Sequence, residues 1–299
     1  DNKIAFRDQI PLTEEEDKVD KITSTFFNIM KPKVGDRRIM GLCIIIPGII
    51  DAENKRILST VIGVGYSDPV VQRFEEAFHD YPFCLLNDTA CFAYAEYVFA
   101  NITEPNFAYI NVSKGVGACL FANGKMLRGA GSNATQFGHF SVDRNGPLCA
   151  CGNHGCVERV VGENALTERA EACGIDLTRF AGRKPLYCDI GAMAEDGDAH
   201  AKELIKDLAV DLSFAISNLI TLFNPSLVVI GGMGVNLGPF FLSNIRDEVQ
   251  NSGFKEFVSN TWIQYSTLGL DSELGGAARY YIDHYYDFFE QMQGGLYAD

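Results

Sequence analysis

The sequence lacks the features of a membrane, secreted or disulfide-bonded protein. No apolar run approaches the roughly 20 residues of a membrane-spanning helix, and the longest, residues 41–50, is broken by Pro47 and Gly48. The first residues, Asp-Asn-Lys, do not resemble a signal peptide. The nine cysteines are an odd number, which fits a reducing compartment better than a disulfide scaffold. We expect a cytoplasmic protein without a membrane partner.

Positive charge is also scarce. The 299 residues contain 25 Lys and Arg against 39 Asp and Glu, a formal net charge of −14. Such a chain is repelled by nucleic acid unless basic residues gather locally. We interpret the small basic cluster of Lys31, Lys33, Arg37 and Arg38 as a solvated loop before a strand. The polypeptide alone is therefore not expected to bind DNA.

Hydrophobic residues make up 47% of the chain, enough for the cores of roughly two domains. Short apolar runs predict strands at residues 38–46, 83–86, 107–112, 117–122, 125–128, 227–230 and 262–266. Amphipathic patterns predict helices at residues 13–30, 70–79, 89–99, 157–172 and 199–223, after 239 and from 274. Residues 47–69 are expected to be looser. This mixture of strands and helices predicts an α/β fold.

Two short signals predict where elements begin and turn. Thr13 followed by Glu16 matches a capping box, which predicts a helix start at Thr13. Asn123-Gly124, between two predicted strands, favours a two-residue hairpin turn.

The most specific motif joins three cysteines to one histidine. Cys149, Cys151 and Cys156 fall within eight residues, and His139 lies ten positions upstream of the first. Three thiolates and one imidazole form the ligand set of a closed, four-coordinate zinc site. The sequence therefore predicts a structural zinc.

Two alternatives to this ligand set remain open from the residues alone. The cysteines could be reduced, buried thiols without a metal, but a loop with Gly152 and Gly155 has little apolar material to pack. These glycines supply the backbone freedom that a tight loop needs. His154 could replace His139 as the fourth ligand; its neighbours indicate a turn tip, so we favour His139.

Four motifs follow one another along the chain. They are Asn87-Asp88 after a strand, Ser-Lys-Gly-Val-Gly at 113–117, Gln-Phe-Gly-His at 136–139, and Asn-Pro-Ser-Leu-Val-Val-Ile-Gly-Gly at 224–232. This order resembles the ROK family (repressors, open reading frames, sugar kinases) over nearly the whole chain. The resemblance is most specific at residues 138–158 and is greatest to regulators of the NagC/XylR type.

The resemblance implies a two-domain actin/hexokinase-like (ribonuclease H-like) α/β fold with a sugar cleft between the domains. It places a smaller domain at residues 1–88 plus 273–299, and a larger domain with the zinc loop at 89–272. It also implies a homodimer, and a zinc held by His139, Cys149, Cys151 and Cys156.

The resemblance further assigns the sugar ligands as Asn87, Asp88, Gln136, His139 and Glu158. Sugar hydroxyls both donate and accept, and carboxylates accept such bonds well. Asp88 could instead serve as a helix N-cap, and Glu158 as a solvated residue of a first helical turn. We favour sugar contact for both.

Two positions depart from the family pattern. Gln136 replaces the usual Glu, and Thr135 replaces a usual glycine. An amide keeps hydrogen-bonding capacity but loses the charge, which predicts altered sugar preference or weaker affinity. A neutral surface exchange is the alternative.

A ROK kinase would need Asp88 as general base, and glycine-rich turns that bind ATP phosphates with magnesium. The family's first such turn, Asp-x-Gly-Gly-Thr, does not occur in the sequence. The second, usually Gly-Thr-Gly-x-Gly, contains Lys114, which crowds the turn; a lysine–phosphate contact is the alternative. The glycines at 231–234 resemble an adenosine-side turn, but we interpret them as strand-to-helix packing.

We therefore predict a non-catalytic sugar sensor: the effector-binding and dimerisation region of a ROK transcriptional regulator, with a sugar or sugar phosphate as ligand. DNA would bind only through an N-terminal winged helix-turn-helix outside this chain. The alternative is an ATP-dependent kinase of the glucokinase or amino-sugar kinase type, with Asp88 as catalytic base and ATP and magnesium as cofactors.

Overall fold

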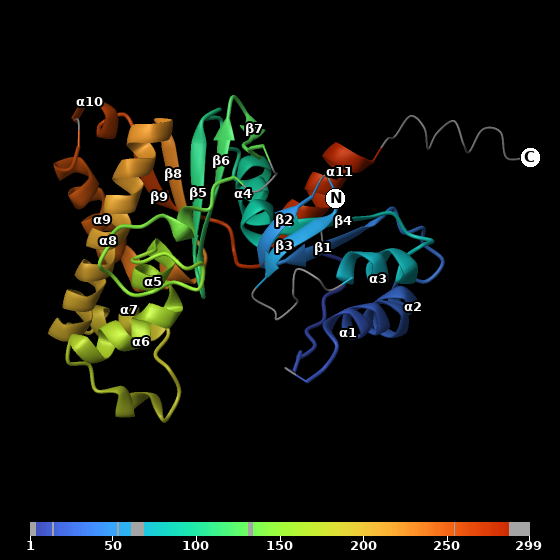
Figure 1. Ribbon diagram of the computed structural model, residues 1–299, viewed down its shortest axis with the longest axis horizontal. Coiled ribbons are helices and arrows are strands. Elements are labelled where there is room, and N and C mark those ends of the chain that lie inside the picture. The colour runs from blue at the N-terminus through green and yellow to red at the C-terminus, as the bar shows by residue number, and fades with distance from the viewer. Residues whose placement is uncertain are drawn as a thin grey trace, which may run out of the picture. The chain divides into compact units, whose positions relative to one another are not determined.

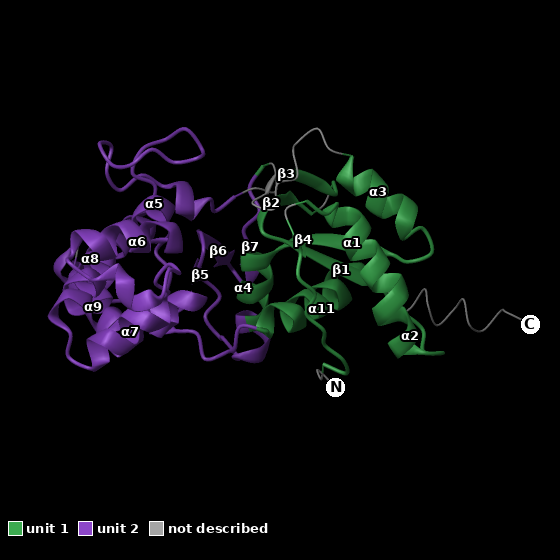
Figure 2. Cartoon of the chain, turned by 90° about the horizontal axis from the view of Figure 1, so that it is seen from below, with its two compact units in different colours: residues 1–95, 130–133, 271–299 green, residues 96–129, 134–270 purple. Residues whose placement is uncertain are grey.

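The computed structural model describes residues 4–13, 15–52, 54–60, 69–130, 134–253 and 255–286. The chain forms two compact units, coloured separately in Figure 2. Unit 1 comprises Asp1–Ala95, Ala130–Asn133 and Asp271–Asp299, and unit 2 comprises Glu96–Gly129 and Ala134–Leu270. The domain limits implied by the resemblance, 1–88 plus 273–299 and 89–272, stay a prediction.

Unit 1 contains two small sheets (Figure 1). The apolar runs β1 (Leu42–Ile46) and β4 (Phe83–Asn87) pair in parallel. Neither strand has an exposed residue, and β4 buries four of its five residues, as expected of parallel strands. An antiparallel pair, β2 (Gly48–Asp51) and β3 (Arg56–Thr60), occupies the region expected to be looser. For these strand residues the expectation was wrong: the hairpin's register shifts after Ile49, and this shift breaks the simple alternation by which a strand is recognised. The rest of the looser region, residues 61–68, lies outside the described residues.

The helices of unit 1 surround these strands. They are α1 (Lys18–Thr25), a π-helical turn η1 (Phe26–Met30), α2 (Lys31–Val34), α3 (Val70–Ala77), the first part of α4 (Asp88–Phe99) and α11 (Ser272–Tyr285). Phe26, Phe74 and Phe78 form an aromatic core with the strand residue Phe83.

The first helix begins later than the capping box at Thr13 predicts. Glu16 does accept the backbone N–H of Thr13 at 3.1 Å. The helix nevertheless starts at Lys18, because the Asp17 side chain caps it and accepts the N–H of Asp20 at 3.0 Å. The predicted start at Thr13 was therefore wrong by one turn.

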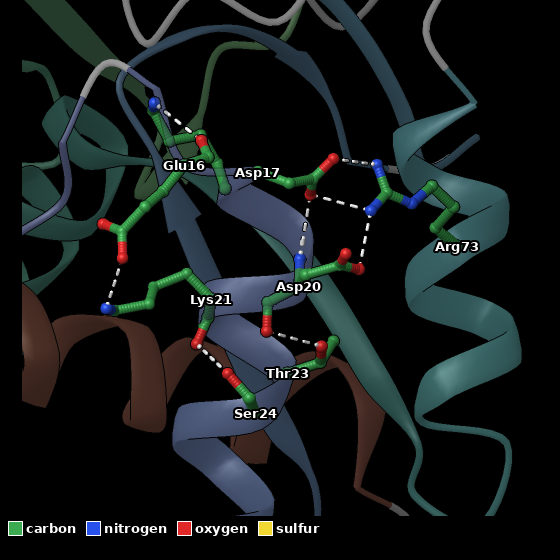
Figure 3. A network of polar contacts seen from close by, with 8 residues as sticks. Glu16, Asp17, Asp20, Lys21, Thr23, Ser24 and Arg73 are labelled. Atoms are coloured by element: carbon green, nitrogen blue, oxygen red, sulfur yellow. Dashed lines mark hydrogen bonds and ion pairs between the residues drawn. The ribbon is translucent and has the colours of Figure 1, made fainter.

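An ion-pair network fixes this helix start to α3 (Figure 3). The Arg73 guanidinium donates to both carboxylate oxygens of Asp17, at 2.9 and 2.7 Å, and to Asp20 at 2.7 Å. The hydrogen bonds from Arg73 lower the pKa of Asp17 to about 2. Asp17 therefore stays ionised through most of the acidic range.

Unit 2 is built on a five-stranded sheet of order β7-β6-β5-β8-β9. The strands are β5 (Phe107–Val112), β6 (Val116–Ala122), β7 (Lys125–Met126), β8 (Leu227–Gly231) and β9 (Trp262–Tyr265). The β6–β7 turn has positive φ at Asn123 (53°) and Gly124 (73°), as a type I′ turn requires. The predicted two-residue hairpin is confirmed.

The helices of unit 2 are α5 (Val157–Val161), α6 (Glu163–Ala172), α7 (Tyr187–Glu195), α8 (Ala199–Phe223), α9 (Gly238–Asn251) and α10 (Lys255–Val258). Figure 1 shows α8 and α9 beside the sheet. The predicted limits of α8 are confirmed, and its apolar stripe lies in the core with Ile110 and Ile230. The other sheet face carries Phe107 and Phe121, whose rings stack 4.5 Å apart.

One helical prediction in unit 2 needs correction, and one helix was missed. The helix expected at 157–172 is divided at Gly162, whose backbone is extended. A Cβ there would lie 2.5 Å from the Glu158 carbonyl oxygen. The helix α7 was not predicted from the sequence.

Within the described ranges, no helix combines the length and apolarity that a membrane crossing requires.

We expect that replacing Arg73 with Ala will raise the pKa of Asp17 toward its ordinary value of about 3.9. A group with a lowered folded pKa stabilises the fold above its unfolded pKa and loses this effect as pH falls through the folded value. The wild-type contribution should thus fade between about pH 4 and pH 2, whereas the variant's contribution should be small throughout, because its folded and unfolded pKa values nearly coincide. Carboxyl NMR titration would measure both values, with Arg37→Ala as control; equal Asp17 titrations would contradict the prediction.

Candidate functional site

The structure brings His139, Cys149, Cys151 and Cys156 together. Their nearest ligand atoms all lie within 4.8 Å of one another. Cys149 Sγ is 3.6 Å from His139 Nδ1, and Cys151 Sγ is 3.6 Å from Cys156 Sγ. A tetrahedral zinc with Zn–S bonds of about 2.3 Å and a Zn–N bond of about 2.0–2.1 Å separates neighbouring ligands by about 3.5–3.8 Å. The four residues therefore fit a tetrahedral metal ion.

The metal-ligand loop is framed by backbone pairing rather than by apolar packing. Isolated antiparallel bridges join Ser141 to Cys156 and Leu148 to His154. The Cys149 N–H donates to the Asn153 carbonyl at 2.7 Å and closes the loop between them.

The two glycines of the loop have different roles. Both have positive φ, 89° at Gly152 and 61° at Gly155, so the predicted need for backbone freedom is confirmed. A Cβ on Gly155 would lie 1.8 Å from the backbone oxygen of Asp143, whereas nothing lies within 4 Å of the corresponding position on Gly152. A side chain therefore lacks space at Gly155 but not at Gly152.

His154 lies outside the cluster. Its side chain is exposed, and its Nδ1 is 3.0 Å from the Gly146 carbonyl oxygen. The structure thus groups His139, and not His154, with the three cysteines; that His139 is the fourth metal ligand stays a prediction.

The remaining candidate residues are divided between the units. Asn87 and Asp88 belong to unit 1, whereas Gln136 and Glu158 belong to unit 2 together with the metal-ligand cluster.

Asn87 and Asp88 end β4 and begin α4, and they have separate roles there. Asn87, not Asp88, caps the helix: its Oδ1 accepts the N–H of Ala90 at 3.0 Å. Its Nδ2 donates to the Gly48 carbonyl at 2.6 Å and to Asp88 Oδ1 at 3.0 Å. The Thr89 N–H also donates to Asp88 Oδ1, at 2.8 Å. All these bonds to Asp88 fall on Oδ1, so Oδ2 can accept from a ligand.

The electrostatic surroundings of Asp88 disfavour its charge. Burial raises the pKa of its carboxyl group above the ordinary value, although the bonds from Thr89 and Asn87 oppose the shift. The pKa of Glu273 is also raised, first by burial and then by the charge of Asp88. Glu273 was missed by sequence reasoning, because the motif at residue 88 gives no indication of its neighbour on α11.

Gln136 is exposed and directly precedes the 3₁₀ turn η2 (Phe137–His139). Its neighbour Thr135 has a φ of 66°, a strained value for a β-branched residue. The Thr135 hydroxyl donates to the Ala118 carbonyl at 2.7 Å, which offsets part of that strain. The departure from the family's glycine is therefore accommodated by a hydrogen bond.

Glu158 lies in the first turn of α5, two residues after the metal-ligand candidate Cys156. Its Oε2 accepts a long hydrogen bond, 3.4 Å, from the N–H of Val116. A Cβ on Gly115 would lie 2.5 Å from the same oxygen. Glu158 is half-buried against the glycine turn of residues 113–117, and so is not a fully solvated helix residue.

The glycine turn 113–117 also packs against the turn at 231–234. Ser113 Oγ donates to Asn111 Oδ1 at 3.0 Å and accepts the N–H of Met233 at 3.1 Å. A Cβ on Gly232 would lie 2.1 Å from Asn111 Oδ1. The glycines at 231–234 thus serve close packing, as the sequence interpretation favoured. The role of Asn111 was not foreseen.

A family model described as the ROK family matches residues 1–283. The chain belongs to the ROK family. The xylose repressor of Bacillus subtilis (strain 168) is 26% identical over 250 residues, which cover 83% of this chain and 62% of the repressor. The DNA-binding transcriptional repressor Mlc of Escherichia coli (strain K12) is 24% identical over 282 residues, 92% of this chain and 68% of Mlc. The chain thus spans about three fifths to two thirds of these relatives.

Solved structures establish the fold. A crystal structure of a ROK family transcriptional regulator, a homologue of E. coli Mlc, matches with a TM-score of 0.74 at 24% identity, over 87% of this chain and 67% of that one. A ROK family glucokinase from Streptomyces griseus, in complex with glucose and AMPPNP, matches with a TM-score of 0.72 at 23% identity, over 87% of each chain. The predicted actin/hexokinase-like α/β fold is confirmed.

We expect Gly155→Ala to destabilise the protein by several kcal/mol, because the strain of positive φ, about 1–3 kcal/mol, adds to a clash with the Asp143 backbone. Gly152→Ala should cost only about 1–2 kcal/mol, since the same change there meets open space. Urea denaturation of the two variants would measure both costs. Equal destabilisation would contradict the packing argument.

Proposed function

We propose that this chain is the sugar-sensing, effector-binding part of a ROK transcriptional regulator, and that it has no catalytic activity. The xylose repressor and Mlc, both named as repressors, resemble it over 83% and 92% of its length. The hydrogen bonds of the glycine turn 113–117 are the main support for the absence of catalytic activity.

A phosphate-binding turn directs its backbone N–H groups at the phosphate oxygens. In this chain the N–H of Val116 is directed at Glu158, and the N–H of Met233 is directed at Ser113. The Ser113 N–H is used within the turn, where it donates to the Gly115 carbonyl. These internal partners favour a structural use of the turn over ATP binding.

The ligand we propose is a sugar or sugar phosphate. Asp88 Oδ2 and the Glu158 carboxylate would accept bonds from its hydroxyl groups, and the Gln136 amide would both donate and accept. Asn87, also predicted as a ligand, would act chiefly by orienting Asp88. His139 faces the cluster with Nδ1, so its Nε2–H could donate to the sugar.

We propose that the cluster binds a structural zinc, with His139, Cys149, Cys151 and Cys156 as its ligands. When bound, zinc would stabilise the thiolate forms of the cysteines and cross-link the loop. Because Cys156 directly precedes α5, this cross-link would hold Glu158 at a defined position.

The regulatory part of the proposal lies outside the single chain. A homodimer would couple sugar binding to DNA binding by a region that is not part of this sequence. Sugar would change the DNA affinity only through different affinities for two states of the dimer.

A second candidate is an ATP-dependent sugar kinase. The glucokinase that holds glucose and AMPPNP has nearly the same TM-score as the regulator. The raised pKa of Asp88 would also suit a general base. In this case ATP and magnesium would be cofactors.

We expect one of D-xylose, D-glucose and N-acetyl-D-glucosamine to raise the melting temperature, because a ligand at 100 times its Kd adds about 2.7 kcal/mol of stability. Asp88→Asn should weaken the response strongly, whereas Asp80→Asn, at an exposed aspartate, should not. Differential scanning fluorimetry would measure both. ATP consumption with these sugars at about 1–100 s⁻¹ would instead establish the kinase.

We expect purified protein to contain about one zinc per chain, and chelation to lower its melting temperature. Cys149→Ser should lose the metal, whereas Cys188→Ser, at an exposed cysteine outside the cluster, should retain it. Acidification should release zinc, because protons compete for the thiolates and the imidazole. Elemental analysis and thermal denaturation test this; metal-free protein of unchanged stability would refute it.

A further inference from the structure

The glycine turn 113–117 contacts the carboxylate of Glu158 in two ways. The Val116 N–H donates to Oε2 at 3.4 Å. Gly115 leaves the space that this oxygen occupies, since a Cβ there would lie only 2.5 Å away. The Val116 N–H therefore bonds Glu158 Oε2, and the missing side chain of Gly115 leaves room for this oxygen.

Hydrogen bonds and close packing join the glycine turn to the segment that carries Glu158. The Ser113 carbonyl accepts from the N–H of Glu163 and from the hydroxyl of Tyr187, both at 3.2 Å. Tyr187 is 1% exposed, and its single hydroxyl proton is shared between the Ser113 carbonyl and the nearer Val161 carbonyl, at 2.8 Å. Gly162 allows close approach to the turn, because a Cβ there would lie 3.2 Å from the Lys114 carbonyl oxygen. The glycine turn 113–117 and the segment that includes helix α5 are thus packed against each other.

We propose that Gly115 and Val116 are positioning residues that aim the Glu158 carboxylate at a sugar hydroxyl. This inference rests on the proposed sugar-binding function and deepens it. The turn fixes one carboxylate oxygen, Oε2, and leaves the other to accept from the ligand. Sugar recognition by unit 2 then depends on two residues that act through Glu158 rather than through a sugar contact of their own.

Gly115→Ala provides a selective test. The atom that its Cβ would meet is the free end of a flexible side chain rather than backbone, so the carboxylate should move while the fold stays intact. Gly269→Ala is the matched control, because no atom lies within 4 Å of a Cβ there. Both variants should melt like the wild type.

The binding experiment is isothermal titration calorimetry with whichever of D-xylose, D-glucose and N-acetyl-D-glucosamine binds the wild type. Gly115→Ala and Glu158→Ala should each weaken Kd about ten-fold or more, as expected for a lost hydrogen bond to a charged group. The double variant should bind no more weakly than Glu158→Ala alone, because Gly115 acts through Glu158. Unchanged affinity in Gly115→Ala, or additive losses in the double variant, would overturn the inference.

Hydrogen exchange of the Val116 amide tests the geometry without any sugar. Exchange should accelerate in Gly115→Ala and in Glu158→Ala, and stay unchanged in Gly269→Ala. Equal exchange rates in all variants would refute the positioning role even if a sugar binds. If the wild type binds none of the three sugars but the amide responds as expected, the proposed ligand fails while the contact between turn and carboxylate stands.

Discussion

The convergence of three sulfurs and one imidazole nitrogen on one point is the constraint on which the rest of the site depends. The loop from His139 to Cys156 has few apolar side chains, so burial alone cannot define its shape. Backbone bridges and the positive φ of Gly155 bring the ligand atoms within 4.8 Å of one another. Helix α5 begins directly after the last of these ligands, and the position of Glu158 therefore follows from the geometry of the cluster.

Outside the cluster, internal hydrogen bonds determine which polar atoms of the candidate residues are already used within each unit. Asn87 uses its amide to cap α4, to bond Gly48 and to hold one oxygen of Asp88. Ser113 likewise uses its hydroxyl within unit 2. Such saturated residues cost little to bury, and they orient the carboxylates beside them. A carboxylate with one oxygen held by such bonds has a defined direction.

The sequence predicted the features that depend on neighbouring residues. The cysteine spacing, the Asn123-Gly124 turn and the limits of α8 are local patterns, and the structure matches each of them. The start of α1 was not predictable in this way, because Asp17 is held by Arg73, 56 residues further along the chain. The contact between Gly115 and Glu158 depends on the folded course of the whole segment between them. No spacing rule encodes it.

The strained backbone at Thr135 has a consequence for comparing this chain with its relatives. Thr135 adopts a conformation suited to glycine and is held there by its hydroxyl group. The adjacent Gln136 is presented from that backbone, so the two departures from the family pattern form one coupled exchange. Restoring a glutamate at 136 alone would place it on a backbone whose freedom differs from that of a Gly-Glu pair. A carboxylate at position 136 would thus have the backbone freedom of the family pattern only if Thr135 were exchanged for glycine at the same time.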